Sequence, residues 1–345
     1  MMKWCRIGIL LLLFAASVAV LLMDLVSRCH TPAGAGHTQR IVSIPPAASF
    51  RRIVRALEKQ GIVHDPLAFR LAARYLGVER KLKAGEYDLN DGMTPMEVLD
   101  RLYRGDVVRY RFTVPEGAAL LWVAERLERR GLGRRGRFLG KATDSVLLNG
   151  LGVNGSSAEG YLFPDSYFLT RDMTEEAIIR MMVRRFWQVF TPQMKRRARE
   201  RGFSIHQVVT LASIVEKETG APEERPLIAA VFLNRLARNI RLQSDPTVIY
   251  GLDHFDGNLN RRDLQTKTPY NTYKIRGLPP GPIANPGLDS LMAVLYPAPV
   301  DYLYFVSRND GTHHFSTTLR EHNRAVWKYQ KSNRSIQRGA KKDFQ

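Results

Sequence analysis

The sequence contains very little cysteine, only two residues in 345. Cys5 lies within an apolar amino-terminal run and Cys29 follows that run, so we expect Cys5 inside a membrane and Cys29 outside it. The two thiols then cannot pair, which excludes a disulfide framework. The folded part of the chain must be stabilised by hydrophobic cores, which an apolar content of 44% allows.

Acidic residues are also scarce relative to basic ones. The chain has 33 Asp and Glu against 52 Lys and Arg, a net charge of +19. This excess favours an anionic partner, which could be a nucleic acid, a membrane surface or the carboxylate-bearing peptides of a cell wall. The densest basic run, at residues 129–137, is typical of a solvated face. The sequence lacks zinc-ligand spacing and an aromatic RNA-binding signature, so we expect no metal, no cofactor and no nucleic-acid partner.

Long hydrophobic runs are limited to one segment near the amino terminus. Residues 7–23 are apolar throughout, and with Asp24, Leu25 and Val26 they give a predicted span at 7–26, about the length of a bilayer-spanning helix. Lys3 and Arg6 precede them, which predicts a cytoplasmic tail at residues 1–6 and an exported remainder. A cleaved signal peptide is the alternative, with AGAG at 33–36 as its candidate cleavage site. We favour an uncleaved single-pass anchor in the inner (cell) membrane, followed by a flexible linker at 27–40.

A strand–helix pattern then occurs twice. Residues 43–61 align without gaps to residues 113–131, and both give a strand end, a proline turn, an apolar-striped helix and a terminal glycine. Between the copies we expect helices opened by Asp65-Pro66 and Thr94-Pro95, with a strand at 85–89. Strand–helix–helix modules of this kind occur in LysM-like glycan-binding domains, although such units also recur in unrelated α+β proteins. The pattern predicts an α+β fold.

A helix later in the chain ends in the string LASIVEKETG, residues 211–220. Ser204 and Gln207 form a capping box that predicts its start, and Gly220 predicts its end, so Glu218 falls in the last turn. Glu218 lies above apolar residues of the preceding turns, and burial there would raise its pKa toward that of a neutral-pH proton donor. Glu216 also lies above apolar residues, so helical geometry does not choose between them. Either carboxylate could instead cap a helix or pair with an arginine.

Four other segments accompany this string. They are EGYLFPDSYFL at 159–169, RLQSDPTVIYGL at 241–252, TPYNTYKIRGLPPGPIANPG at 268–287 and YLYFVSRNDGTHHFSTTLREHN at 302–323. With these motifs in this order, the chain from about Ile41 to Tyr329 resembles the MltG (YceG-like) endolytic murein transglycosylases. The resemblance implies a LysM-like α+β subdomain at 41–108 and a mixed α/β YceG-like catalytic domain at 109–335, and we expect a basic tail at 336–345. It places the catalytic acid at Glu218, which is followed by Thr219.

The motifs also supply candidates for sugar binding. Gln243 has no local structural duty and could hydrogen-bond an N-acetyl group, whereas Asp245 precedes Pro246 and is expected to cap a short helix. The Pro-rich segment 268–287 cannot be a regular helix or central strand, and its phenols and amides suit one wall of a sugar cleft. The substrate-binding candidates are Gln243, Ser244, Asp245, Tyr250, Tyr270, Asn271 and Tyr273.

Glu159 and Asp165, which lie among aromatic residues, are secondary carboxylate candidates with Glu216, and we expect the first two to be structural. The hairpin around Asn309-Asp310-Gly311 carries His313 and His314, which we expect to pack or line a rim and not to bind a metal.

The number of carboxylates bears on the reaction. A conventional glycosidase uses two, whereas the resemblance implies one, Glu218. In a lytic transglycosylase that residue protonates the oxygen between N-acetylmuramic acid and N-acetylglucosamine, then accepts the proton of the muramic acid 6-hydroxyl, which leaves a 1,6-anhydro end. The implied role is termination of nascent strands, with glycan strands, the membrane and peptidoglycan synthases as partners. A hydrolytic muramidase using Asp245 or Glu159, and a noncatalytic wall-binding scaffold, are the alternatives.

Overall fold

The computed structural model describes residues 2–331, with side chains for residues 7–330, and it divides into two compact units. The first comprises the chain up to Arg111 together with Phe168–Met173. The second comprises Phe112–Tyr167 and the chain from Thr174 onward. The predicted basic tail at 336–345 and the last residues of the predicted catalytic domain, 332–335, lie outside the described residues.

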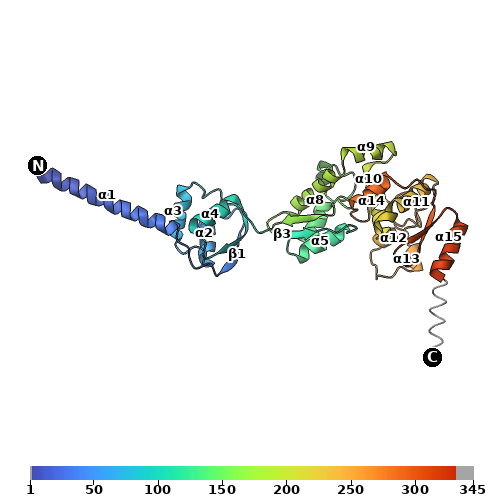
Figure 1. Ribbon diagram of the computed structural model, residues 1–345, viewed down its shortest axis with the longest axis horizontal. Helices are drawn as coiled ribbons and strands as arrows, with labels where there is room; N and C mark the ends of the chain where they lie inside the picture. The colour runs from blue at the N-terminus through green and yellow to red at the C-terminus, as the bar shows by residue number, and fades with distance from the viewer. Residues whose placement is uncertain (1, 332–345) are drawn as a thin grey trace, which may run out of the picture. The chain divides into compact units, whose positions relative to one another are not determined.

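The first unit begins with the long helix α1 (Met2–Cys29), drawn in blue in Figure 1. Its segment Ile7–Cys29 is apolar enough and long enough to cross a membrane. The expected linker at 27–40 is not free, because Cys29 is buried in the core of the unit with Sγ 3.7 Å from the carbonyl oxygen of Ala68. Backbone amides of Gly34 and Thr38 donate to Asp91 at 2.6 and 3.0 Å. These long-range contacts were not visible in the composition of the segment.

The rest of the first unit contains the elements that the sequence predicts. They are β1 (Gln39–Ile44), α2 (Phe50–Lys59), α3 (Pro66–Tyr75), β2 (Gly85–Asn90) and α4 (Pro95–Arg104). β1 and β2 are antiparallel, with Gln39 opposite Asn90. Asp65 caps α3 by accepting hydrogen bonds from two backbone amides at 3.0 Å, and a capping box opens α4 at Thr94. The helices cover the sheet through a core that includes Val54, Leu57, Phe69, Tyr87 and Leu99.

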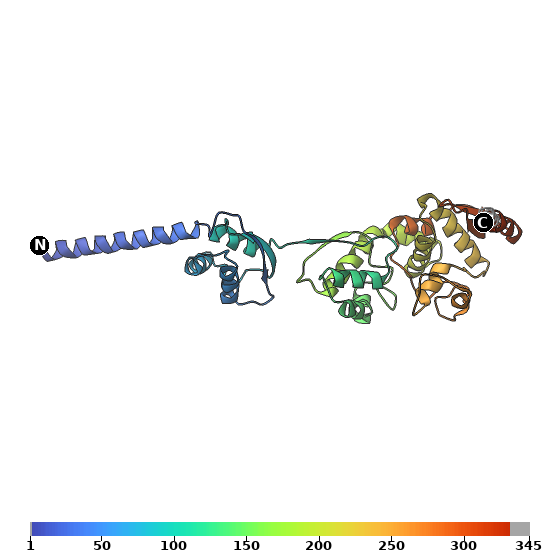
Figure 2. The ribbon, with the colours of Figure 1, turned by 90° about the horizontal axis from the view of Figure 1, so that it is seen from below.

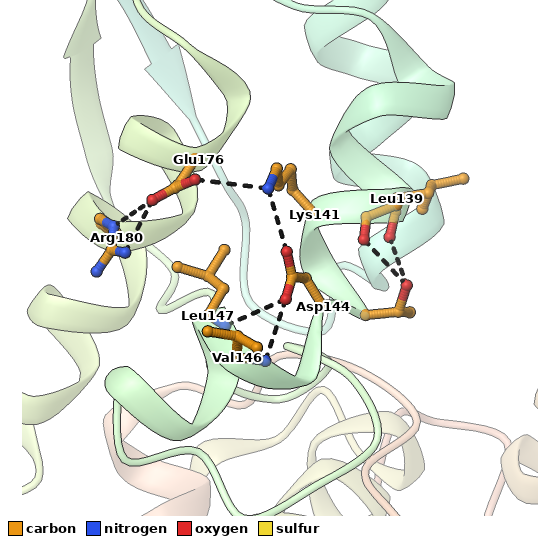
Figure 3. Close-up of polar contacts among 9 residues, drawn as sticks. Leu139, Lys141, Asp144, Val146, Leu147, Glu176 and Arg180 are labelled. Carbon is orange, nitrogen blue, oxygen red and sulfur yellow. Dashed lines mark hydrogen bonds and ion pairs between the residues drawn. The ribbon is translucent and has the colours of Figure 1, made fainter.

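A strand pair precedes the helices of the second unit, and each of its two strands has residues in both units. β3 (Tyr110–Thr113) pairs with β4 (Ser166–Leu169), and the intervening and following helices are α5 (Leu120–Arg129), α6 (Arg135–Ala142), α7 (Ser145–Gly150) and α8 (Glu175–Val189). Figure 3 shows the surface where α6, α7 and α8 meet. There Lys141 lies 3.1 Å from Asp144 and 3.6 Å from Glu176, which pairs with Arg180 at 2.8 Å. These partly exposed pairs contribute at most about 1 kcal/mol each, so they mark a solvated face.

The remainder of the second unit is mostly helical. Its elements are α9 (Pro192–Glu200), α10 (Ile205–Glu218), a 3₁₀ turn (Pro222–Glu224), α11 (Arg225–Ala237), α12 (Asp245–Gly251), α13 (Arg261–Gln265), α14 (Leu288–Leu295), β5 (Tyr304–Ser307), β6 (His313–Ser316) and α15 (Leu319–Val326), which runs into a π-helical turn at Trp327–Lys331. α10 packs against α11 and α14, as the two views in Figures 1 and 2 agree. β5 and β6 form the predicted hairpin, with Ser307 opposite His313.

The two copies of the strand–helix repeat end in the same way. Gly61 and Gly131 follow α2 and α5 with φ of +70° and +64°, the left-handed conformation that glycine adopts at no steric cost. Each glycine amide bonds back into its helix at 2.9 Å, which satisfies an otherwise free carbonyl of the last turn.

Gly131→Ala should therefore destabilise the protein by about 1 kcal/mol, because the alanine Cβ is strained at positive φ. A Cβ at Gly131 meets no atom within 4 Å, so crowding would not contribute. Gly136→Ala, within α6 and equally uncrowded, is the matched control and should stabilise by up to about 1 kcal/mol. Urea unfolding of both variants would check this, and equal shifts of the same sign would contradict it.

Candidate active site

The carboxylate singled out by the sequence lies at the end of a buried helix. The predicted capping box of Ser204 and Gln207 opens α10, and Glu218 is its last residue. The helix is buried from Val208 to Val215, so it presents its final turn from within the core. The predicted stop before Gly220 is confirmed, since Glu218 is in the last turn, but the chain leaves the helix through an extended Thr219 (φ −138°, ψ 140°) and not through a left-handed glycine.

Glu218 is half-buried and held by one side-chain hydrogen bond. Ser244 Oγ donates to Oε1 of Glu218. Burial raises the pKa of Glu218 to about 7, the Ser244 hydrogen bond opposes this, and the nearby charge of Asp245 raises it further. A carboxyl group with this pKa is about half protonated at neutral pH, which suits a general acid that later acts as a base.

A cavity of about 280 Å³ opens beside Glu218. Its walls come from α10, α11, the segment before α12, the Pro-rich loop, the hairpin and α15. The lining residues are Glu218, Arg235, Leu242, Gln243, Asp245, Tyr273, Phe305 and His322. The structure thus brings four predicted site residues together at one cavity, and Ser244 joins them through its bond to Glu218.

The segment from Gln243 to Asp245 is arranged differently from the sequence prediction. Ser244 is the N-cap of α12 and Asp245 is its first residue, so the expected capping role of Asp245 is wrong. The carboxylate of Asp245 instead accepts a hydrogen bond from the Tyr273 hydroxyl at 2.6 Å. Gln243 is exposed at the cavity with φ of +56°, an uncommon conformation for a residue other than glycine. Such a conformation persists only where surrounding contacts enforce it, as is frequent at functional sites.

Two polar residues of the cavity lining were missed by sequence reasoning, as were the apolar Leu242 and Phe305. Arg235 is buried on α11, where it donates to the carbonyls of Leu303 and Leu242, each at 2.7 Å. His322 stacks on Tyr304 with ring centroids 5.2 Å apart, and burial together with Arg235 lowers its pKa. Its Nδ1 is buried and has no hydrogen-bond partner among the described residues. An arginine within an apolar helix and the REHN end of the last motif were the available signals.

Glu216 has a different environment from Glu218. Its side chain is 6% exposed and accepts hydrogen bonds from Arg225 Nη2 at 3.3 Å and from the amide of Gly287 at 2.9 Å. The same guanidinium lies 3.5 Å from Glu116 and 3.3 Å from Asp289. Glu216 therefore joins α10 to α11 and to the start of α14, which is the arginine-pairing role that the sequence left open.

Glu159 lies in a second polar cluster away from this cavity lining. It is 2% exposed, and its two carboxylate oxygens accept from the amide of Leu120 at 2.9 and 3.0 Å, at the start of α5. Tyr250 donates to it at 3.1 Å, and the ring of Tyr270 lies 4.8 Å from that of Tyr250. Burial raises the pKa of Glu159 to about 7. Tyr250 and Tyr270 are thus tied to Glu159, which acts as a helix cap.

Asn271 and Asp165 are also occupied by structural contacts. The Asn271 side chain is fully buried, donates to the carbonyl of Thr266 at 2.6 Å and accepts from the amide of Tyr273 at 2.9 Å. It therefore shapes the turn that presents Tyr273 to the cavity. Asp165 pairs with Arg185 at 2.7 Å.

The Pro-rich loop at 268–287, which we expected to form one wall of a sugar cleft, is hydrogen-bonded to buried parts of the second unit. The amide of Ile283 donates to Ser213 on α10 at 3.0 Å. Asn285 is buried, and its amide group donates to Ala118 at 2.7 Å and accepts from Leu162 at 2.9 Å. Of this loop, only Tyr273 lines the cavity around Glu218.

Within residues 2–331 no group of three or more His, Cys, Asp and Glu side chains is placed to hold a metal ion. His313 pairs with Glu224, with Nδ1 2.6 Å from the carboxylate, and so packs the hairpin onto the turn before α11.

Comparisons with known proteins agree on one family. A model of the YceG-like family matches residues 42–328. The chain is 34% identical over 307 residues to the endolytic murein transglycosylase of Bacillus subtilis (strain 168), covering 84% of each protein. It is 31% identical to the endolytic murein transglycosylase of Streptococcus pneumoniae serotype 2, covering 83% of this chain and 57% of that protein. A 2.6 Å crystal structure of a yceG-like protein from Listeria monocytogenes matches with a TM-score of 0.58 and 33% identity, over 83% of this chain and 98% of that one.

Glu216→Gln should destabilise the protein by about 2–4 kcal/mol, because it removes one charge from a buried ion pair and leaves Arg225 with its more exposed partners. Glu223→Gln, an exposed carboxylate a few residues away, is the control and should leave the melting temperature unchanged. Calorimetry would compare the two. An unchanged melting temperature in Glu216→Gln would contradict the structural role.

Proposed function

Because the chain belongs to the YceG-like family, as its motifs predicted, we propose that it is an endolytic lytic transglycosylase acting on peptidoglycan. The observation that carries the proposal is the Glu218 carboxyl group, which lies at the cavity, is oriented by Ser244 and has a pKa raised to about 7. The relatives from Bacillus subtilis and Streptococcus pneumoniae are named for this activity.

In the proposed reaction, protonated Glu218 donates to the glycosidic oxygen between N-acetylmuramic acid and N-acetylglucosamine, and the bond from that oxygen to C1 breaks. The 6-hydroxyl oxygen of the muramic acid then bonds to C1, and its proton passes to the Glu218 carboxylate. The product carries a 1,6-anhydro end and no water is consumed. Ser244 stabilises the charged form between the steps, while Gln243, Asp245 and Tyr273 offer hydrogen-bonding groups to the sugar.

A hydrolytic muramidase is the second candidate, since Asp245 lines the same cavity as Glu218 and could act as the second carboxylate. Mass spectrometry of the products separates the two reactions by the mass of one water. The Tyr273 hydroxyl already occupies one oxygen of Asp245, which favours a positioning role for that residue.

We propose further that α1 is an uncleaved anchor in the inner membrane, with residues 1–6 in the cytoplasm and the catalytic unit outside it. The order β1, α2, α3, β2 supports a LysM-like, glycan-binding role for residues 41–108. An anchored enzyme of this kind would cut nascent strands near the membrane, beside the synthases, and so terminate their elongation.

Glu218→Gln should abolish the anhydro product, because the amide keeps the shape of the side chain but has no transferable proton. The loss should reach about 10,000-fold or more, since general acid–base groups contribute about 100-fold to 10,000-fold and one residue serves both steps. The assay is digestion of purified sacculi with identification of the sugar ends. Glu216→Gln is the control and should keep most activity at a temperature where it stays folded. An active Glu218→Gln would overturn the assignment.

The plot of kcat/KM against pH should show a single fall, on the alkaline side. Glu218 must be protonated in the free enzyme, so kcat/KM should fall as pH rises above the pKa of about 7. The negative charge of Asp245 contributes to that raised pKa, so Asp245→Asn should lower the pKa of Glu218 and move this fall to lower pH while activity persists. An inactive but folded Asp245→Asn would instead favour the hydrolytic reaction.

A further inference from the structure

The outer side of α3 carries an apolar stripe. Leu67, Leu71 and Tyr75 are spaced four residues apart, so they share one face, and they are 65%, 39% and 91% exposed. The opposite face packs into the core of the first unit through Ala68, Phe69, Ala72 and Ala73. A helix that is apolar on both faces is normally covered on both, so the stripe indicates a surface that contacts a partner.

The position of α3 indicates which partner this is. Arg28 Nη1, in the last turn of α1, lies 3.3 Å from the carboxylate of Asp65, which caps α3. Cys29 Sγ lies 3.7 Å from the carbonyl oxygen of Ala68. Figure 1 likewise places α3 beside the carboxyl end of α1. Two contacts therefore fix the start of α3 to the end of the helix that we propose spans the membrane.

The depth of α3 follows from the length of α1. A hydrocarbon core of about 30 Å accommodates roughly 20 helical residues at about 1.5 Å each. Counted from Ile7, the first residue of the apolar segment, the core ends near Val26, which puts Arg28 among the lipid headgroups. Asp65 lies beside Arg28 and is at the same depth. The ten residues of α3 extend only about 15 Å from that point.

The side chains around the stripe suit a headgroup layer. Arg70 and Arg74 follow Leu67 and Leu71 by three residues each, so they flank the stripe on α3. Long basic side chains extend toward anionic headgroups while their stems cover apolar surface, and tyrosine is enriched at the membrane–water boundary. This combination is typical of helices that lie in the interface plane.

We propose that α3 is an interfacial helix whose Leu67, Leu71 and Tyr75 insert into the outer surface of the membrane that α1 spans. The proposal rests on the anchoring proposed above. It assigns the first unit a lipid-facing side and identifies the partner of that side as a bilayer surface containing anionic lipid.

The test uses the full-length chain reconstituted in vesicles of phosphatidylethanolamine and phosphatidylglycerol. Spin labels are placed singly at Tyr75→Cys, at Glu58→Cys on the exposed side of α2 and at Leu13→Cys within α1, in a Cys5→Ser, Cys29→Ala background that melts cooperatively. The measured quantity is the ratio of the label's accessibility to oxygen to its accessibility to a water-soluble nickel complex. This ratio should be several-fold higher for the label at 75 than for the label at 58. Equal values at 75 and 58, with the label at 13 in lipid, would overturn the interfacial helix and leave the anchor intact. A label at 13 exposed to water would overturn both.

A charge substitution tests the stripe itself. Leu67→Asp with Leu71→Asp should return the label at 75 to the water-like value without lowering the melting temperature, because both leucines are exposed. Leu121→Asp, at an exposed leucine of α5 in the second unit, is the matched control and should change nothing at position 75. An unchanged label in the double variant would contradict the insertion of these side chains.

Discussion

The hydrogen bond from Ser244 to Glu218 is the interaction on which the candidate site depends. It joins the last residue of α10 to the N-cap of α12, and so fixes an acidic side chain that the helix alone would leave free to rotate. Ser244 is itself buried, with its amide donating to Thr272 and its carbonyl accepting from Thr247. The orientation of the carboxyl group is thus set by the buried threonine pair behind it, and the cavity forms on the other side.

Two carboxylates only two positions apart have opposite physical roles because α10 turns them toward different neighbours. Glu216 meets a guanidinium and a backbone amide, which tie it to α11 and to the start of α14 and give it a structural role. Glu218 meets a hydroxyl group and is otherwise largely shielded from water, and its pKa of about 7 suits it to donate and then accept a proton near neutral pH. The sequence spacing shows that the two side chains diverge, and only the fold shows which one reaches the arginine.

What the sequence predicted well was local. The capping box at Ser204, the helix starts at Asp65-Pro66 and Thr94-Pro95 and the Asn309–Gly311 hairpin were all visible because short-range backbone energetics determine them. The family was visible in the motifs. What could not be predicted depends on packing between distant segments. Examples are the burial of Cys29, the hydrogen bonds from the expected linker to Asp91 and the N-cap position of Ser244, where Asp245 was expected. Arg235 and His322 reach the cavity only through the tertiary fold, so the arginine within an apolar helix and the REHN string could not by themselves place them there.

The position of the cavity walls in the sequence determines when, during synthesis of the chain, the site can form. Glu218 lies nearly two-thirds of the way along the chain, whereas Phe305 and His322 come from the hairpin and from α15, among the last described elements. Synthesis proceeds from the amino terminus, so α1 and the first unit are complete long before these walls have been translated. An unfinished or truncated chain can carry Glu218 and still have no enclosed cavity around it. The order of the elements therefore delays assembly of the site until nearly the whole chain has folded.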